Sequence, residues 1–180
     1  MKRWIVTALG KDRPGIVAGV TQALYRLGAN LEDSAMRRLE GEFAIMLIFS
    51  VSASHTEETL RQAFAPLQQR MTLAVHLKRL SPSEIQPPRK LGRPYLISVY
   101  GSDRTGIVYR ISQALSRAGI NITDVHTHRS SGVGASLYLL LLEVEIPKRV
   151  KIATLERSLK QLGKRLGIEV TLSTAEPAVL

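Results

Sequence analysis

Gly10-Lys-Asp-Arg-Pro-Gly-Ile-Val17 and Gly101-Ser-Asp-Arg-Thr-Gly-Ile-Val108 are two copies of one segment, offset by 91 residues in a chain of 180. The match continues without a gap, and 13 of the 24 positions from Gly10 to Asp33 are identical in the second copy. An internal repeat of this kind indicates that one structural unit occurs twice. The chain is therefore expected to hold two copies of the same small fold.

Each copy predicts the same strand and helix around this segment. A β-branched and aromatic run that stops at the glycine indicates a first strand, over residues 4–9 and 95–100. One apolar helical face follows in each copy: Ile16, Val17, Val20, Leu24 and Leu27, and then Ile107, Val108, Ile111, Leu115 and Ala118. Gly28 and Gly119 stand where such a helix would end in a left-handed residue.

A hairpin, a second helix and a last strand complete each copy. The expected hairpin strands are residues 31–39 with 43–51, and residues 122–129 with 137–146. Matching Val51 with Val144 makes the second turn two residues longer than the first. Thr56 is the expected N-cap of the first copy's second helix. The sequence thus predicts an α+β chain of two ferredoxin-like βαββαβ domains in tandem, with antiparallel sheets and both helices on one face.

A proline-rich stretch separates the two copies. Four of the eight prolines of the chain fall there: Pro82, Pro87, Pro88 and Pro94. Such a stretch is typical of a semi-rigid spacer. The expected boundaries are a first domain at 1–80, a linker at 81–93, a second domain at 94–175 and a tail at 176–180.

Composition excludes several classes of protein. The chain has no cysteine, which removes disulfides, thiolate zinc sites and cysteine nucleophiles. No apolar run approaches the ~18 residues of a transmembrane helix, and Asp12 and Pro14 interrupt the apolar start before it could act as a signal peptide. A cytoplasmic protein without a membrane partner is expected. The net charge of +10 is divided evenly, because residues 1–90 and residues 91–180 each carry +5, so no basic nucleic-acid-binding arm is indicated.

The repeated loop between the first strand and the first helix is the candidate binding site. Glycine lets the backbone approach a ligand, and a helix N-terminus offers free N–H groups and a positive dipole end that suit a carboxylate. Asp12 and Asp103 could cap the helix or pair with a ligand ammonium, and Asn30 and Asn121 could present amides to the same ligand. Capping and tight turning need the same residue types without any ligand, so both interpretations stay open.

The stretch Val6–Val17, together with Asn30-Leu-Glu-Asp-Ser34, resembles the ACT domain and is similar to the first domain of glycine cleavage system transcriptional repressors. The resemblance implies an amino-acid-sensing regulatory homodimer without a cofactor, not an enzyme. It implies glycine or serine as the ligands to test first and a regulatory partner such as a transcription activator. It also implies a ligand where one unit meets a neighbouring unit. The implied ligand-binding residues are Gly10, Asp12, Arg13, Gly15 and Ile16, and then Gly101, Asp103, Arg104, Gly106 and Ile107.

Two further patterns allow more than one interpretation. His126 and His128 share one face of a predicted strand and could hold a metal, but the sequence shows no third ligand and no metal site is predicted. No nucleophile and base stand in a pattern that indicates catalysis. The second copy's second helix has a basic surface: Lys148, Arg149, Lys151, Arg157, Lys160, Lys164 and Arg165. The alternative function is therefore direct nucleic-acid binding by this helix face, although no groove-reading motif accompanies it.

Overall fold

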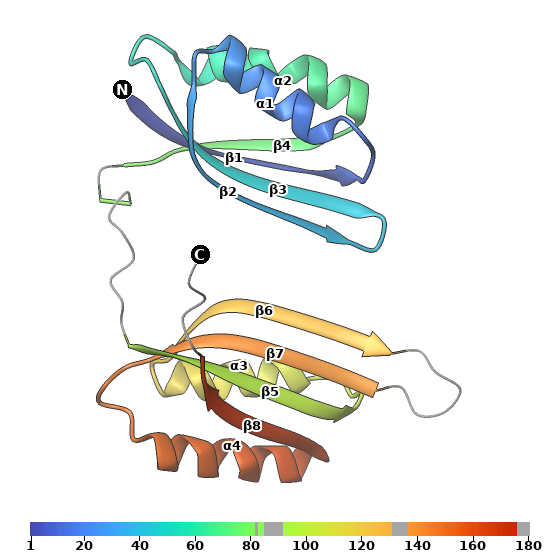
Figure 1. Cartoon of the computed structure of the whole chain (residues 1–180), viewed down its shortest axis with the longest axis vertical. Coiled ribbons are helices and arrows are strands. Elements are labelled where there is room, and N and C mark those ends of the chain that lie inside the picture. Colours follow the sequence, from blue (N-terminus) through green and yellow to red (C-terminus); the bar gives the residue numbers. More distant parts are fainter. Residues whose placement is uncertain (82, 85–91, 131–136, 176–180) are drawn as a thin grey trace. The chain divides into compact units, whose positions relative to one another are not determined.

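The computed structural model describes residues 1–81, 83–84, 92–130 and 137–175. The chain divides into two units, residues 1–87 and 88–180, and each unit has its own sheet, helices and core (Figure 1). Both units follow the βαββαβ order that the repeat predicts.

Each unit is a four-stranded antiparallel sheet with two helices on one face (Figure 1). The first unit consists of β1 (Lys2–Lys11), α1 (Ile16–Arg26), β2 (Asn30–Leu39), β3 (Glu42–Val51), α2 (Glu57–Met71) and β4 (Ala74–Arg79). The second unit consists of β5 (Arg93–Ser102), α3 (Ile107–Arg117), β6 (Asn121–Ser130), β7 (Leu137–Ile146), α4 (Ile152–Leu166) and β8 (Ile168–Thr174). The strand orders β2-β3-β1-β4 and β6-β7-β5-β8 confirm the ferredoxin-like fold.

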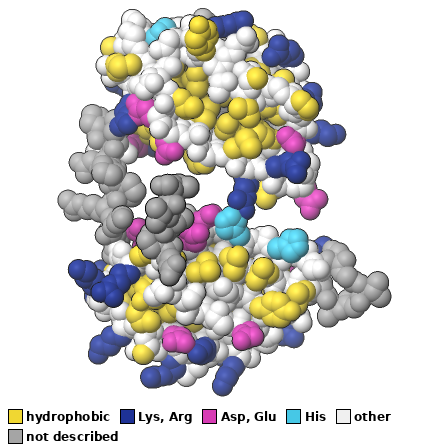
Figure 2. All heavy atoms as spheres, in the orientation of Figure 1, with side chains coloured by type: hydrophobic (Ala, Val, Ile, Leu, Met, Phe, Trp, Pro, Cys, Tyr) yellow, Lys and Arg dark blue, Asp and Glu magenta, His cyan; other side chains and the backbone are white. Residues whose placement is uncertain are grey.

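The core of each unit lies between the helices and the sheet. Along β1, Trp4, Val6 and Ala8 are buried, whereas the alternate residues are half-buried or exposed. This period of two places one apolar face of the strand against the helices. The other sheet face has no helix of its own unit over it, and hydrophobic side chains reach the surface of both units (Figure 2).

The first helix of each unit ends as the sequence predicts. Gly28 has a positive φ of 61°, and the Ala29 N–H donates to the Leu24 carbonyl over 3.0 Å. This is the hydrogen bond of a Schellman turn, and Gly119 repeats it with a φ of 67°. The prediction that Val17 and Val108 lie on the buried face is wrong, because the sheet covers a narrower stripe of the helix.

The second hairpin turn is four residues longer than the first, so the predicted difference of two is wrong. Trp4 pairs with Phe49, and its equivalent Tyr95 pairs with Val144, so Val144 corresponds to Phe49. The strand ends leave residues 40–41 and 131–136 as the two connections. Any apolar residue can fill a position on the buried face of a strand. Two valines, Val51 and Val144, therefore need not occupy equivalent positions. Residues 131–136, which lie between the two predicted hairpin strands of the second copy, lie outside the described residues.

The predicted linker at 81–93 follows β4, which ends at Arg79. β5 begins at Arg93, which is one residue inside the predicted linker. Residues 82 and 85–91 of that linker and the tail at 176–180 lie outside the described residues. Within the described part of the chain, no helix is long and apolar enough to cross a membrane.

Candidate functional site

The glycine-turn loops, residues 10–15 and 101–106, each begin with a glycine that has no room for a side chain. A Cβ at Gly10 would lie 2.7 Å from Leu73 Cδ2 and 3.0 Å from the Thr72 carbonyl oxygen. At Gly101 it would lie 2.9 Å from Ile168 Cγ2 and 3.1 Å from Ile168 Cα. Both glycines therefore let the first strand approach the start of the last strand, with or without a ligand.

The second glycine of each loop starts the helix. Gly15 and Gly106 are left-handed, with φ of 93° and 91°, which favours glycine. Their carbonyls accept the N–H groups of Gly19 and Arg110 over 2.8 and 2.9 Å. Since the N-cap is a glycine, no side chain at that position bonds the first-turn N–H groups. These groups have no partner within the helix and remain available as donors.

Asp12 and Asp103 each face an arginine from the neighbouring hairpin. Asp12 Oδ2 lies 3.6 Å from Arg38 Nη1, and Asp103 Oδ2 lies 3.5 Å from Arg129 Nη1. Each carboxylate side chain is 35% exposed. Within the described residues neither carboxylate accepts a hydrogen bond from a first-turn N–H, so the capping alternative is not what the structure shows. The same ion pair thus stands beside the helix start in both units.

Arg38 and Arg129 are site residues that the sequence analysis missed. They are identical at the offset of 91, but they lie beyond the stretch in which the repeat is dense. The register of the hairpin shifts between Leu31 and Asp33, and again between Ile122 and Asp124. Such a bulge changes which strand residues face a given side. The repeat identity could have flagged both arginines, whereas their orientation depended on the bulge.

The remaining predicted loop residues have different surroundings. Ile16 and Ile107 are each 2% exposed, so only their backbone N–H groups can reach a ligand. Arg13 is exposed, and the described residues give it no hydrogen bond or ion pair. Its equivalent Arg104 donates from Nη1 to the Leu166 carbonyl over 3.3 Å, at the C-terminus of α4.

Asn30 and Asn121 lie at the opposite end of the sheet from the loop of their own unit. Asn30 pairs with Ser50, which pairs with Arg3, and Gly10 lies seven residues further along β1. Seven residues span roughly 23 Å at ~3.3 Å per residue. The prediction that one unit's asparagine and loop hold the same ligand is wrong, because β2 runs parallel to β1 and starts where β1 starts. The same register separates Asn121 from Gly101.

The two loops differ in one nearby side chain. Tyr138 pairs with Gly101 across β5 and β7, and Phe43 pairs with Gly10 in the first unit. Burial raises the pKa of the Tyr138 phenol above its ordinary value, and the negative charge of Asp103 raises it further. The second loop therefore has a neutral hydroxyl near its carboxylate where the first has a buried phenyl ring.

His126 and His128 share the open sheet face, as their spacing predicts, and His126 is half-buried while His128 is exposed. The His126 Nε2 atom lies 2.7 Å from Asp124 Oδ2. Among the described residues, no group of three or more His, Cys, Asp or Glu side chains could hold a metal ion. The histidines therefore contribute a hydrogen bond between His126 and Asp124 and polar surface.

The chain resembles known proteins in both halves. Residues 2–78 and 93–173 match the family model of the ACT domain. The chain is 25% identical to the glycine cleavage system transcriptional repressor of Escherichia coli (strain K12), over 94% of this chain and 88% of that protein. It is 38% identical to a UPF0237 protein of Pyrobaculum aerophilum, over 43% of this chain and 82% of that protein.

Solved structures share the whole fold. The crystal structure of an unknown protein from Galdieria sulphuraria superposes with a TM-score of 0.79 and 25% identity, covering 97% of this chain and 99% of that one. A structure assigned to a glycine cleavage system transcriptional repressor has a TM-score of 0.69 at 22% identity, covering 97% and 98%. The chain therefore belongs to the ACT domain family, with one ACT domain in each half.

Proposed function

We propose that this chain is a non-enzymatic regulator that binds a free amino acid at its glycine-turn loops and signals to a partner protein. The observation that carries the proposal is the ion pair of Asp12 with Arg38, repeated as Asp103 with Arg129 beside the start of α3. A turn needs neither the arginine nor its retention in both units. The pairing of opposite charges at a helix N-terminus is instead what a zwitterion requires.

The site can satisfy both charges of an amino acid. Asp12 would accept the ligand ammonium, while Arg38 and the first-turn N–H groups of α1 would donate to its carboxylate. The separations of 3.5 and 3.6 Å are longer than the ~2.8 Å of a tight charge-assisted hydrogen bond. Because each carboxylate is also partly exposed, a ligand can enter between the two charges without breaking a buried pair.

A second copy of the chain would complete the site. Val17 and Val108 directly follow the loops, and they are 43% and 36% exposed. An exposed apolar side chain at the same position of each unit favours contact with another unit. A unit of a second copy would cover these valines and could bring its own asparagine, Asn30 or Asn121, to the loop. A homodimer with ligand at the junction is therefore part of the proposal.

Similarity to the Escherichia coli repressor supports a role in transcription through a protein partner, and a DNA-binding activator is the partner to test first. Such a regulator would work in the cytoplasm. Signalling needs a ligand affinity that differs between two states of the protein, because equal affinity shifts no equilibrium. Glycine and serine are the proposed ligands, since a small zwitterion fits a site built from backbone and two charged side chains.

Calorimetric titration of the full chain with glycine, serine and a wider amino-acid panel tests the proposal. Saturable binding of one amino acid is expected, and Asp12→Asn or Asp103→Asn should weaken its own site about tenfold or more, which is the effect of losing a charged hydrogen bond. Asp33→Asn removes the same charge from β2, away from the loops, and should leave the affinity unchanged. No heat with any amino acid, or an equal loss in Asp33→Asn, would contradict the proposal.

A further inference from the structure

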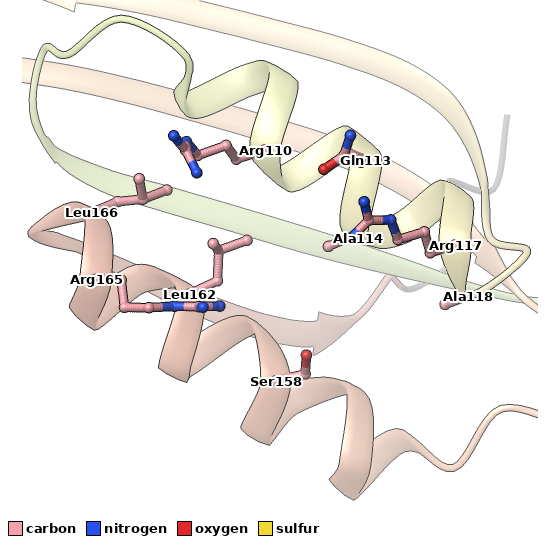
Figure 3. Close-up of a pocket in the computed structure, with 9 residues that line it drawn as sticks. All are labelled: Arg110, Gln113, Ala114, Arg117, Ala118, Ser158, Leu162, Arg165 and Leu166. Carbon is pink, nitrogen blue, oxygen red and sulfur yellow. The ribbon is translucent and has the colours of Figure 1, made fainter.

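A groove runs between α3 and α4 on the helix side of the second unit. Its main hollow has a volume of about 640 Å³ and is lined from both helices, with Arg110 and Arg117 from α3 and Arg165 from α4 (Figure 3). A second hollow of about 370 Å³ shares Ala114, Ala118 and Ser158 with the first and extends to Arg149 and Lys151. We call the two hollows together the α3–α4 groove.

An arginine stands in the groove where the first unit has a glycine. In the first unit, a Cβ at Gly19 of α1 would lie 2.5 Å from Leu67 Cδ1 of α2, so these helices close on one another there. At the offset of 91 the equivalent of Gly19 is Arg110. The second helices, α2 and α4, are offset by 95, so the equivalent of Leu67 is Leu162. Both line the groove of the second unit. A side chain that the first unit has no room for therefore accompanies the opening in the second.

The charge of the α3–α4 groove is uncompensated. Five cations line it and no acidic residue does, among the described residues: Arg110, Arg117, Arg149, Lys151 and Arg165. Over the described ranges, none of the five forms an ion pair with an acidic side chain. Like charges gathered in one hollow repel each other, and an anionic partner would relieve that repulsion.

The start of α4 adds to the positive potential. Lys151 is its N-cap residue, no side chain caps it, and its first turn has no acidic residue. In the first unit, Thr56 caps α2 by accepting the Thr59 N–H over 3.2 Å, and Glu57 and Glu58 follow in the first turn. A cation at the N-terminus of a helix is unfavourable because it lies at the positive end of the helix dipole. The lysine at the start of α4 therefore lowers the stability of that helix end and favours the binding of an anion.

Part of the lining of the groove, which we call its floor, is apolar. The alanines Ala114 and Ala118 and the leucines Leu155, Leu159 and Leu162 line it. A phosphate backbone or a free small anion would leave this surface unused, whereas a peptide with one acidic and one apolar face would cover it. Arginine also matches carboxylates because its planar fork donates two parallel hydrogen bonds.

We propose that the α3–α4 groove docks an acidic amphipathic segment of a partner protein. Carboxylates of the segment pair with Arg110, Arg117 and Arg165, and its apolar side chains lie on the alanine and leucine floor. This docking rests on the proposed function in one respect only, which is that the protein that carries the acidic segment is the regulated partner. Docking itself needs no amino acid at the glycine-turn loops.

Fluorescence anisotropy of the full chain with a labelled synthetic peptide tests the docking. The probe is a helical peptide with leucine on one face and glutamate on the other, and no amino acid is added. Saturable binding is expected, with a loss of about tenfold or more in Arg165→Gln and in Arg110→Gly. Arg110→Gly gives α3 the residue of the first unit, and Arg165→Gln keeps the test valid if the glycine weakens the helix.

The first unit supplies the matched control. Arg26 and Arg70 are the equivalents of Arg117 and Arg165, so the double variant Arg26→Gln/Arg70→Gln removes two charges where the helices are closed, one more than either groove variant removes. It should leave the affinity within about twofold. An equal loss in this control, no binding of the peptide, displacement by inorganic phosphate, or tighter binding of duplex DNA would each overturn the proposal.

Two variants separate this result from the sensing proposal. Asp12→Asn and Asp103→Asn should each weaken amino-acid binding at its own loop about tenfold or more and leave the peptide affinity unchanged. Peptide binding without amino-acid binding would refute sensing alone, and amino-acid binding without peptide binding would refute docking alone.

Discussion

The helix layers of the two units differ more than their loops and sheets do. Both units keep the left-handed glycine and the Asp–Arg pair at the helix start. In the first unit the helices approach closely at Gly19, whereas in the second unit a groove lies at Arg110. A feature retained in both copies of a repeat indicates a shared task, while a feature of one copy indicates a separate one. The loops are thus candidates for a common ligand, and the α3–α4 groove for a second partner.

The same contrast corrects the inference from charge. Each half of the chain carries +5, which argued against a concentrated basic surface. Net charge ignores position, and in the second unit five cations line one groove without an acidic neighbour among the described residues. The basic surface expected on α4 is real, but its exposed residues Arg157, Lys160 and Lys164 do not line this groove.

The largest expected effect is that of giving the first unit the arginine that the second unit has at this helix position. Gly19→Arg would force a side chain against Leu67 and should lower the free energy of unfolding by about 2–3 kcal/mol, as overpacking does. Urea denaturation followed by tryptophan fluorescence measures it, since the only tryptophan, Trp4, is buried in the first unit. Arg110→Gly should cost only about 1 kcal/mol, from helix propensity, and circular dichroism follows its unfolding because the second unit holds no tryptophan. Equal costs for both changes would mean that the first helix layer opens as readily as the second.

The glycines shared by both units come next. Gly10→Ala and Gly101→Ala should each lower the free energy of unfolding by about 1–2 kcal/mol, because each added methyl meets the start of the last strand. Thermal denaturation followed by circular dichroism measures both variants. Gly41→Ala is the control, since a Cβ there has nothing within 4 Å. A neutral effect at Gly10 would show that its retention serves a ligand and not packing.

The helix starts should respond with opposite signs. Thr56→Ala removes the cap of α2 and should destabilise the chain by about 1 kcal/mol. Lys151→Thr gives α4 a cap and removes a cation from its positive end, so it should stabilise by about 0.5–1 kcal/mol. Guanidinium denaturation of both variants measures these changes in the free energy of unfolding. A destabilised Lys151→Thr would mean that the lysine already has a structural role.

The smallest expected effect is a shift in the pKa of Tyr138, which lies beside the second glycine-turn loop and has no equivalent tyrosine beside the first. The pKa of Tyr138 is raised in the folded chain above its unfolded value, so the neutral phenol contributes stability below the unfolded pKa that is lost as pH rises through the folded pKa. Asp103→Asn should lower the pKa of Tyr138, with burial still holding it above the ordinary value. Absorbance titration of tyrosinate, with Tyr138→Phe to identify the signal, measures it. An unchanged titration would show that Asp103 does not act on the phenol.

The fold and half of the candidate site could be predicted from the residues alone. The offset of 91, the alternation along β1 and the glycines at the helix ends each depend on neighbours in sequence. Loop residues Gly15 and Asp12 were identified because they recur. Arg38 was missed, since a bulge in β2 decides which side its guanidinium faces. Asn30 was misplaced, since the direction of β2 relative to β1 decides which end of the sheet it occupies.

By itself the sequence determined a tandem repeat of βαββαβ units, the turns that need glycine, and the charges that each copy retains. These follow from local rules of period, capping and backbone conformation. Only the tertiary structure decided that Gly19 closes one helix layer and that Arg110 stands in the open groove of the other. The physical reason is that the distance between two packed helices depends on the side chains that lie between them. These side chains are far apart in the sequence and come into contact only when the chain folds.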